Sequence, residues 1–265
     1  MTTLTGAGKS LRSPDSGVTS WLGSIAVFLA IMALWWLASN AGWISRVFLP
    51  TPEATWVSLK NGLLEGELLA FTWATVTRMF EGWLLASLIG VALGALIGIS
   101  ANARAYLQPT LEFMRPLPAS ALLPLAISIF GLNPNMVLSV VAFGAMWPVL
   151  LATVHGFAAV EPRLQEVARC LQLSRGAFVW KVGLPNALPD ILAGMRLSLT
   201  VSLIVSVVGE MIASQPGLGQ AILLAARAFR ASELFAGIVL LGLIGFASSA
   251  LLAAFEKRFL KWQHP

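Results

Sequence analysis

Few residues of this chain have the types and spacing that catalysis or metal binding requires. The sequence contains one cysteine, Cys170, and two histidines, His155 and His264, so it has no cluster with the spacing of metal ligands. No two acidic residues share a face within an apolar run, and no catalytic triad is found. We therefore expect no metal, no cofactor and no catalytic activity.

A short N-terminal motif is similar to the end of a phosphate-binding loop. Residues 6–10 read Gly-Ala-Gly-Lys-Ser, but the full pattern places a glycine at position 3, where this chain has Thr3. No apolar strand precedes the motif to position such a loop. Since residues 1–20 are rich in Ser, Thr and Gly, we predict a disordered, cytoplasmic segment that binds no nucleotide.

The most strongly patterned polar segment covers residues 160–189, between two apolar runs. Pro162 suits the first turn of a helix, where its missing N–H has no helical partner to lose. Four apolar residues then recur at helical spacing and predict one face of an amphipathic helix: Leu164, Val167, Ala168 and Leu171. Glu166 lies off this face, free to point outward or to pair with Arg163 or Arg169.

A second short helix is expected directly after this one. Ser174 can cap it, and Leu184-Pro185 and Pro189 are expected to end it and to begin the next apolar run. A connection that only joined two spans could be much shorter. We therefore interpret residues 160–185 as a surface for a partner protein.

This segment resembles the signature loop of ABC importer permeases, E-A-A, three residues, G, nine residues, I-x-L-P. Here the pattern is Glu166-Val167-Ala168, Gln172 and Val182-x-Leu184-Pro185 at the same spacing. Gln172 replaces the family's glycine, which predicts a change at the turn, and Gly176 is the candidate for a relocated one. Three further stretches resemble the nitrate, sulfonate and taurine branch, so the resemblance covers roughly residues 45–262: Phe48-Leu49-Pro50-x-Pro52, Arg115-Pro116-x-Pro118, and Glu210-Met211 with Gly217-Leu218-Gly219.

Composition independently indicates a membrane protein. The chain is 57% apolar and 11% charged, against about 25% charged in soluble domains. Runs long enough for a hydrocarbon core of about 30 Å predict an all-α fold with six spans: Trp21–Trp43, Gly82–Ser100, Ala119–Phe130, Met136–Gly156, Ile191–Ala213 and Leu234–Phe255. Residues 21–265 are expected to form a single transmembrane domain, with the patterned loop between spans four and five.

The stretches between spans also carry signals. Thr51-Pro52-Glu53 is typical of a helix start, and the helix it opens is expected to lie on the membrane surface. Residues 104–118 are expected to be a short loop.

The second predicted span carries a stripe of small residues, one at every fourth position: Ala86, Gly90, Gly94 and Gly98. Such a stripe favours close packing against another helix, with a ligand groove as the alternative.

Four residues are candidates for a translocation path: Pro118, Pro124, Pro148 and Glu210. Prolines predict a broken third span, and a broken span at membrane depth needs protein or a water-filled cavity to satisfy its freed carbonyls. A simple kink is the alternative.

A carboxylate within a span, such as that of Glu210, is costly unless it is solvated or paired. We predict that Glu210 meets water, or a donor on a neighbouring helix or copy, with extension of its side chain to the membrane interface as the alternative. It is too far along its helix to pair with Arg196.

Basic residues predict the orientation of the spans. With six spans and both termini cytoplasmic, eleven Lys and Arg residues fall in inner segments and five in outer ones, with Arg196 inside a span. The inner set includes Arg104, Arg115 and the loop, and the outer set includes Arg78. Because the basic residues are scattered between apolar runs, no nucleic-acid partner is expected.

The resemblance implies the permease subunit of an ATP-driven importer in the bacterial inner membrane. Its partners would be ABC ATPase subunits, a periplasmic or lipid-anchored substrate-binding protein, a second permease copy and membrane lipid. The implied residues of ATPase coupling are Glu166, Val167, Ala168, Arg169, Gln172, Leu184 and Pro185. A small anion such as a sulfonate, taurine or nitrate is the expected substrate, with a pyrimidine precursor or an aromatic acid as alternatives. A standalone channel or carrier, or a structural or signalling membrane protein, are the alternatives to a permease.

Overall fold

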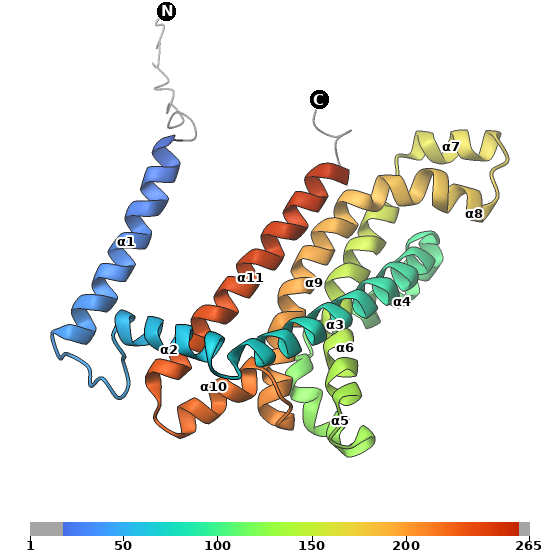
Figure 1. The fold of residues 1–265 in the computed structure, drawn as a ribbon. Helices are drawn as coiled ribbons and strands as arrows, with labels where there is room; N and C mark the ends of the chain where they lie inside the picture. The colour runs from blue at the N-terminus through green and yellow to red at the C-terminus, as the bar shows by residue number, and fades with distance from the viewer. Residues whose placement is uncertain (1–17, 260–265) are drawn as a thin grey trace, which may run out of the picture.

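The computed structural model describes the backbone of residues 18–259, and within that range it contains helices and no strand. Of the segment 1–20 that was expected to be disordered, residues 1–17 lie outside this description, and 18–20 begin the first helix. Figure 1 shows the helices as a tilted bundle, with the first helix standing apart from the rest. In chain order the longer helices are α1 (Val18–Asn40), α2 (Pro52–Leu64), α3 (Leu68–Gly98), α4 (Ala101–Met114), α6 (Pro134–Ala158), α9 (Leu184–Ala213), α10 (Leu218–Arg227) and α11 (Ala231–Phe259).

Five stretches of the described chain are long and apolar enough to cross a membrane, namely α1, α3, α6, α9 with the short turns before it, and α11. A bent pair of helices gives a sixth crossing if the pair is counted as one span. It consists of α4 followed by the short helices η1 (Ala119–Leu122) and α5 (Leu123–Phe130). The chain bends by 78° between α4 and the segment formed by η1 and α5. The predicted all-helical architecture is therefore confirmed, and a bent helix pair lies where the broken or kinked third span was predicted.

Three predicted boundaries were wrong. α3 begins at Leu68, fourteen residues before the expected Gly82, so Arg78 lies inside a span and not in an outer loop. Residues 101–114 form helix α4 where a short loop was expected. α9 begins at Leu184 and not at Ile191, and it contains Pro189. A π-helical turn, Val179–Gly183, directly precedes it, and Pro185 lies in its first turn, where a proline N–H is not needed.

The core of the bundle is formed by α3, α6 and α9, which pack against one another. The small-residue stripe of α3 faces α6 at very short range. A Cβ added to Gly94 would lie 2.5 Å from the Cβ of Thr153, and one added to Gly98 would lie 2.6 Å from the Cβ of Phe157. Since real Cβ atoms do not approach this closely, glycine at these positions allows the two backbones to pack.

Helix α2 is anchored to α1 near its start. Thr51 caps α2 as predicted, accepting a hydrogen bond from the N–H of Ala54 at 3.2 Å. The indole of Trp36 donates to Glu53 at 2.8 Å, and the indole of Trp35 donates to the carbonyl of Pro50 at 2.9 Å. A backbone N–H donated to the Glu53 carboxylate, together with the side chains of Thr51 and Trp36, lowers the pKa of that carboxyl group.

The two ends of the bundle carry different elements (Figure 1). One end, which we call the α7 end, holds the start of α1, the end of α11 and the short helices α7 (Pro162–Cys170) and α8 (Arg175–Phe178). The opposite end, the α10 end, holds α2, α5 and α10. This arrangement agrees with an even number of crossings, and it places the patterned loop at the same end of the bundle as the start of α1 and the end of α11.

Candidate functional site

The patterned loop projects from the α7 end as two short helices (Figure 1). α7 begins at Pro162, as predicted. Of its four apolar-face residues, only Ala168 is turned toward the bundle, at 6% exposure. Leu164, Val167 and Leu171 are 43%, 53% and 66% exposed. The apolar face predicted from the sequence therefore exists, but this chain leaves most of it uncovered.

The turn after α7 remains at Gln172. Its backbone has φ +50°, in the left-handed region that glycine adopts without cost. The N–H of Leu173 bonds the carbonyl of Ala168 at 3.0 Å, and the N–H of Gln172 bonds that of Arg169 at 2.9 Å, which is how such a helix end is closed. Gly176 lies inside α8 and not in a positive-φ turn, so the expected relocation of the turn was wrong.

The second half of the loop continues directly into α9. Ser174 caps α8, accepting from the N–H of Ala177 at 3.2 Å, as predicted. Leu184 and Pro185 do not end a helix; they begin α9 after the π-helical turn, which corrects the expected stop. Asn186 donates to the carbonyl of Gly156 at 3.1 Å, and Gly183 packs on the ring of Phe157, so the loop is held on the end of α6.

The charged side chains of α7 lie open to solvent. Glu166, Arg163 and Arg169 are exposed, as is the free thiol of Cys170. Among the residues that the structure describes, Glu166 forms no ion pair, so the helical pairing considered for it is not found. Its carboxylate and the uncovered apolar face are both available to another protein.

The three prolines considered for the path occupy the break and the middle of a span. Pro118 directly precedes η1 and Pro124 lies in the first turn of α5; both are exposed. Pro148 lies inside α6 and is half-buried. Their place in a translocation path remains a prediction.

Glu210 lies fully buried near the end of α9 and is surrounded by donors. Its carboxylate accepts from the hydroxyl of Thr75 at 3.0 Å and from the N–H of Gly219 at 2.8 Å, and it forms an ion pair with Arg78. The Thr75 hydroxyl also accepts the N–H of Leu218 at 2.9 Å. We call these residues the Glu210 cluster.

The Glu210 cluster joins three helices, α3, α9 and α10. Of the predicted partners of Glu210, a donor on a neighbouring helix is the one found, and Arg196 pairs with Glu256 instead. The motif Gly217-Leu218-Gly219 closes around the carboxylate: a Cβ on Gly217 would lie 2.3 Å from the Glu210 Cδ, and one on Gly219 would lie 2.3 Å from the carbonyl of Val207. A side chain at either position would clash, so both positions require glycine.

Two sequence signals for this region were missed. The four-residue stripe of α3 extends backward from Ala86 through Gly82 to Arg78, which places the arginine on the packing face. On α9, Ser198, Ser202, Ser206 and Glu210 also recur every four residues, and all four are fully buried. Ser202 donates to the carbonyl of Met79 and Ser198 to that of Ala145, both at 2.6 Å.

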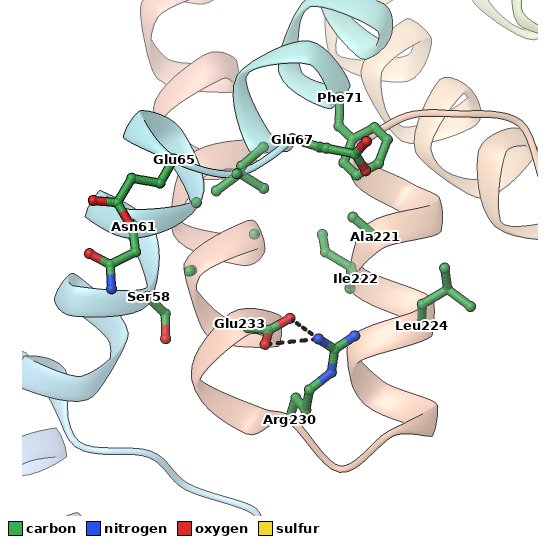
Figure 2. A pocket seen from close by; sticks show the side chains of 15 residues that line it. Ser58, Asn61, Glu65, Glu67, Phe71, Ala221, Ile222, Leu224, Arg230 and Glu233 are labelled. Carbon is green, nitrogen blue, oxygen red and sulfur yellow. Dashed lines mark hydrogen bonds and ion pairs between the residues drawn. The ribbon is translucent and has the colours of Figure 1, made fainter.

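A cavity of about 640 Å³ opens at the α10 end, between α2, the start of α3, α10 and the start of α11. Figure 2 shows Glu233 and Arg230 facing each other across its lower edge, where they form an exposed ion pair at 2.8 Å. Its polar lining also includes Ser58, Asn61, Glu65 and Glu67. In the part of the chain that the structure describes, no group of three or more His, Cys, Asp or Glu residues could hold a metal.

Named relatives are similar to this chain over nearly its whole length. An aliphatic sulfonates transport permease protein, SsuC, of Bacillus subtilis is 32% identical, covering 96% of this chain and 92% of its own length. The taurine transport system permease protein TauC of Escherichia coli is 31% identical, covering 92% and 90%. The bicarbonate transport system permease protein CmpB of Synechococcus elongatus is 27% identical, covering 94% and 95%.

Solved structures show the same fold. A chain of the inward-facing MetNI methionine ABC transporter superposes with a TM-score of 0.58 at 22% identity, covering 71% of this chain and 95% of that one. A chain of an amino acid ABC transporter superposes with a TM-score of 0.56 at 23% identity, covering 72% of this chain and 93% of that one.

The family described as "Binding-protein-dependent transport system inner membrane component" matches residues 86–261. The chain belongs to this family of inner-membrane transport components.

Proposed function

We propose that this chain is the transmembrane permease subunit of an ATP-driven importer and carries a small anion across the bacterial inner membrane. The observation that carries the proposal is the loop at the α7 end. It presents three exposed apolar side chains on helix α7, together with Glu166, which has no ion pair among the described residues. The loop is held to the end of α6 at Gly183 and by the Asn186 side chain just after it. A folded amphipathic helix whose apolar side chains this chain leaves uncovered is suited to receiving force from another protein.

The energy for uptake would come from a separate ATPase that grips residues 160–185. ATP binding closes the ATPase pair, and the loop transmits that movement to the spans, which alternate between two orientations. Since α8, the π-helical turn and α9 run on without a loop between them, displacement of the loop is transmitted directly to α9. In this proposal the α7 end and both termini face the cytoplasm.

The translocation path would lie between two copies of the chain, lined by the broken third span, α6 and α9. A periplasmic or lipid-anchored binding protein would deliver substrate at the α10 end. The names of the relatives, which include sulfonate, taurine and bicarbonate permeases, favour a small anion. Pro118, Pro124 and Pro148 are retained as path residues in this proposal, because they mark where the broken span and α6 depart from regular helix.

Charge reversal at Glu166 tests the docking role of the loop. Loss of a fixed contact to the ATPase typically costs about 2–5 kcal/mol, which is at least tenfold in affinity. We expect Glu166→Lys to leave the permease folded and inserted while association with the ATPase and whole-cell uptake are lost. Pull-down of the ATPase from membranes and uptake of labelled substrate measure the two effects.

Glu65→Lys is the matched control for association, since Glu65 is an exposed, unpaired glutamate at the α10 end and the change in net charge is the same. It should leave ATPase pull-down unchanged. Normal association and uptake in the Glu166→Lys variant would contradict the proposed coupling role.

A further inference from the structure

A second cavity lies at the α7 end, beneath the loop. Its volume is about 340 Å³, within the range of small-ligand sites. One wall is the junction of α3 and α4, including Gly98 and Ala101, and the other is formed by α7 and α8. The cavity therefore lies where the loop meets the spans.

Three arginines from three different helices line this cavity: Arg104 of α4, Arg169 of α7 and Arg175 of α8. No acidic side chain lines it among the described residues, and none of the three arginines belongs to an ion pair found there. Arg104 donates to the carbonyl of Gly98, which fixes its guanidinium at the cavity wall. Three like charges around one small space repel one another unless an anion is present.

The start of α4 adds a further positive contribution. α4 is fourteen residues long and begins at Ala101, on the cavity wall. Its first N–H groups have no partner within the helix, and the helix dipole places partial positive charge at this end. Ser100 satisfies the N–H of Ala103, which leaves the earlier N–H groups directed at the cavity end of the helix.

We propose that this cavity is an anion site that takes a phosphate group. Guanidinium groups bind phosphate through paired hydrogen bonds, and a helix N-terminus favours the same ligand. The phosphate would belong either to a soluble cytoplasmic anion or to the headgroup of an anionic lipid. The site takes Arg169 and Arg175 from the loop proposed to receive the ATPase and Arg104 from the spans.

A bound phosphate would connect α4 to both helices of the loop. Arg104 belongs to the broken third span, whereas Arg169 and Arg175 belong to the loop, and one anion between them would replace repulsion with attraction. Occupancy would therefore stiffen the loop on the spans. The site would make the strength of coupling depend on the phosphate compounds or lipids at the cytoplasmic face.

The test uses the full chain in nanodiscs of zwitterionic lipid and follows amide exchange of residues 168–176. One arm adds inorganic phosphate against chloride at equal ionic strength, and the other replaces part of the lipid with phosphatidylglycerol. At a free ligand concentration about ten times Kd, exchange through opening of the site should slow about tenfold. Protection by phosphate alone identifies a soluble anion, protection by lipid alone identifies a headgroup, and protection by both identifies a site that either can fill.

Arg104→Gln/Arg175→Gln should abolish the protection, and Arg258→Gln, an exposed arginine at the same end that does not line the cavity, should retain it. The double variant also loses the hydrogen bond from Arg104 to Gly98, which could impair folding. Arg175→Gln alone keeps that hydrogen bond, and it should weaken the protection. Absence of protection in both arms, or protection that survives the double substitution, would overturn the proposal. Protection that appears only when the ATPase is added would overturn it as well, because the arginines would then hold an acidic segment of that partner.

Discussion

Glu210 and Glu166 lie at opposite ends of the bundle and differ in almost every property that determines how a carboxylate acts. Glu210 is fully buried, forms an ion pair with an arginine, and accepts hydrogen bonds from a hydroxyl and a backbone N–H. Glu166 is exposed and has no ion pair among the described residues. The same contrast holds for their apolar neighbours, since Leu218 is fully buried whereas Leu171 is 66% exposed.

The difference indicates that the Glu210 cluster is complete in itself and the loop is not. In the Glu210 cluster, groups on two neighbouring helices satisfy the buried carboxylate without another protein. At the α7 end, the backbone is closed by caps and a tight turn, but the side chains are left open. A closed backbone with uncovered side chains is expected of a surface that folds without its partner but functions through it.

The largest effect should follow from breaking the Glu210 cluster. Arg78→Met leaves the Glu210 carboxylate buried without its cation, and such a change typically costs about 3–5 kcal/mol. We expect a matching fall in the free energy of unfolding in detergent, with reduced accumulation in the membrane. Denaturant unfolding of the purified chain measures the change.

A second substitution separates the charge effect from simple loss of packing. Arg78→Met/Glu210→Gln removes both charges and keeps an amide oxygen to accept from Gly219, so it should be more stable than Arg78→Met alone. As the exposed counterpart, Arg230→Met removes a pair whose side chains are 55% and 48% exposed, and it should cost less than about 1 kcal/mol. If Arg78→Met and Arg230→Met lowered the free energy of unfolding equally, the Glu210 cluster would not be a main source of stability at the α10 end.

The next effect should appear only in the presence of a partner. Val167→Asn/Leu171→Asn makes the uncovered face of α7 polar without emptying any core, so the free energy of unfolding should change by less than about 0.5 kcal/mol. Association with the ATPase should fall at least tenfold, because about 1.5–3 kcal/mol is expected for each apolar side chain that the partner buries. Titration of purified ATPase into permease nanodiscs gives the affinity.

Substitution at Ala168 provides the matched comparison on the same helix. Ala168→Asn places a polar group where α7 is 6% exposed toward the bundle, so stability should fall in the isolated chain. A loss of stability in the Val167→Asn/Leu171→Asn variant equal to that of Ala168→Asn would show that the open face is covered within this chain after all.

The sequence was most informative where its pattern had one interpretation. The caps at Thr51 and Ser174 and the start of α7 at Pro162 all followed from local residue chemistry. The α3 and α9 boundaries did not, because a charged residue or a proline can lie inside a helix as well as at its end. Arg78 is tolerated inside α3 only because Glu210 is 132 residues away in the chain and adjacent in space, and no local rule could supply that partner.

The patterned loop shows the opposite case. Its residues and spacing could be recognised from the sequence, but the exposure of its apolar face could not, since an amphipathic helix usually turns that face to its own core. The anion cavity also depends on long-range placement: Arg104, Arg169 and Arg175 are separated by up to 71 positions and meet only after folding.

The smallest effect concerns the turn between the two loop helices. Gln172 has φ +50°, a conformation that costs a residue with a Cβ about 1–2 kcal/mol and costs glycine little. Gln172→Gly should therefore stabilise the loop, by about 0.5–1 kcal/mol once the greater freedom of glycine in the unfolded chain is included. Because this energy is local, slower amide exchange of Leu173 and its neighbours is a more sensitive readout than global unfolding.

Gly176→Ala distinguishes this turn from the alternative position. Gly176 is helical, and a Cβ there would meet no atom within 4 Å, so alanine should also stabilise α8, by about 0.5–1 kcal/mol. If the turn were instead at Gly176, alanine would be strained there and glycine at position 172 would bring no gain. Faster exchange in Gly176→Ala combined with unchanged exchange in Gln172→Gly would thus contradict the observed closure of α7. Slower exchange in both variants would show that the chain keeps the family's turn at the same position, with a glutamine held in a glycine's conformation.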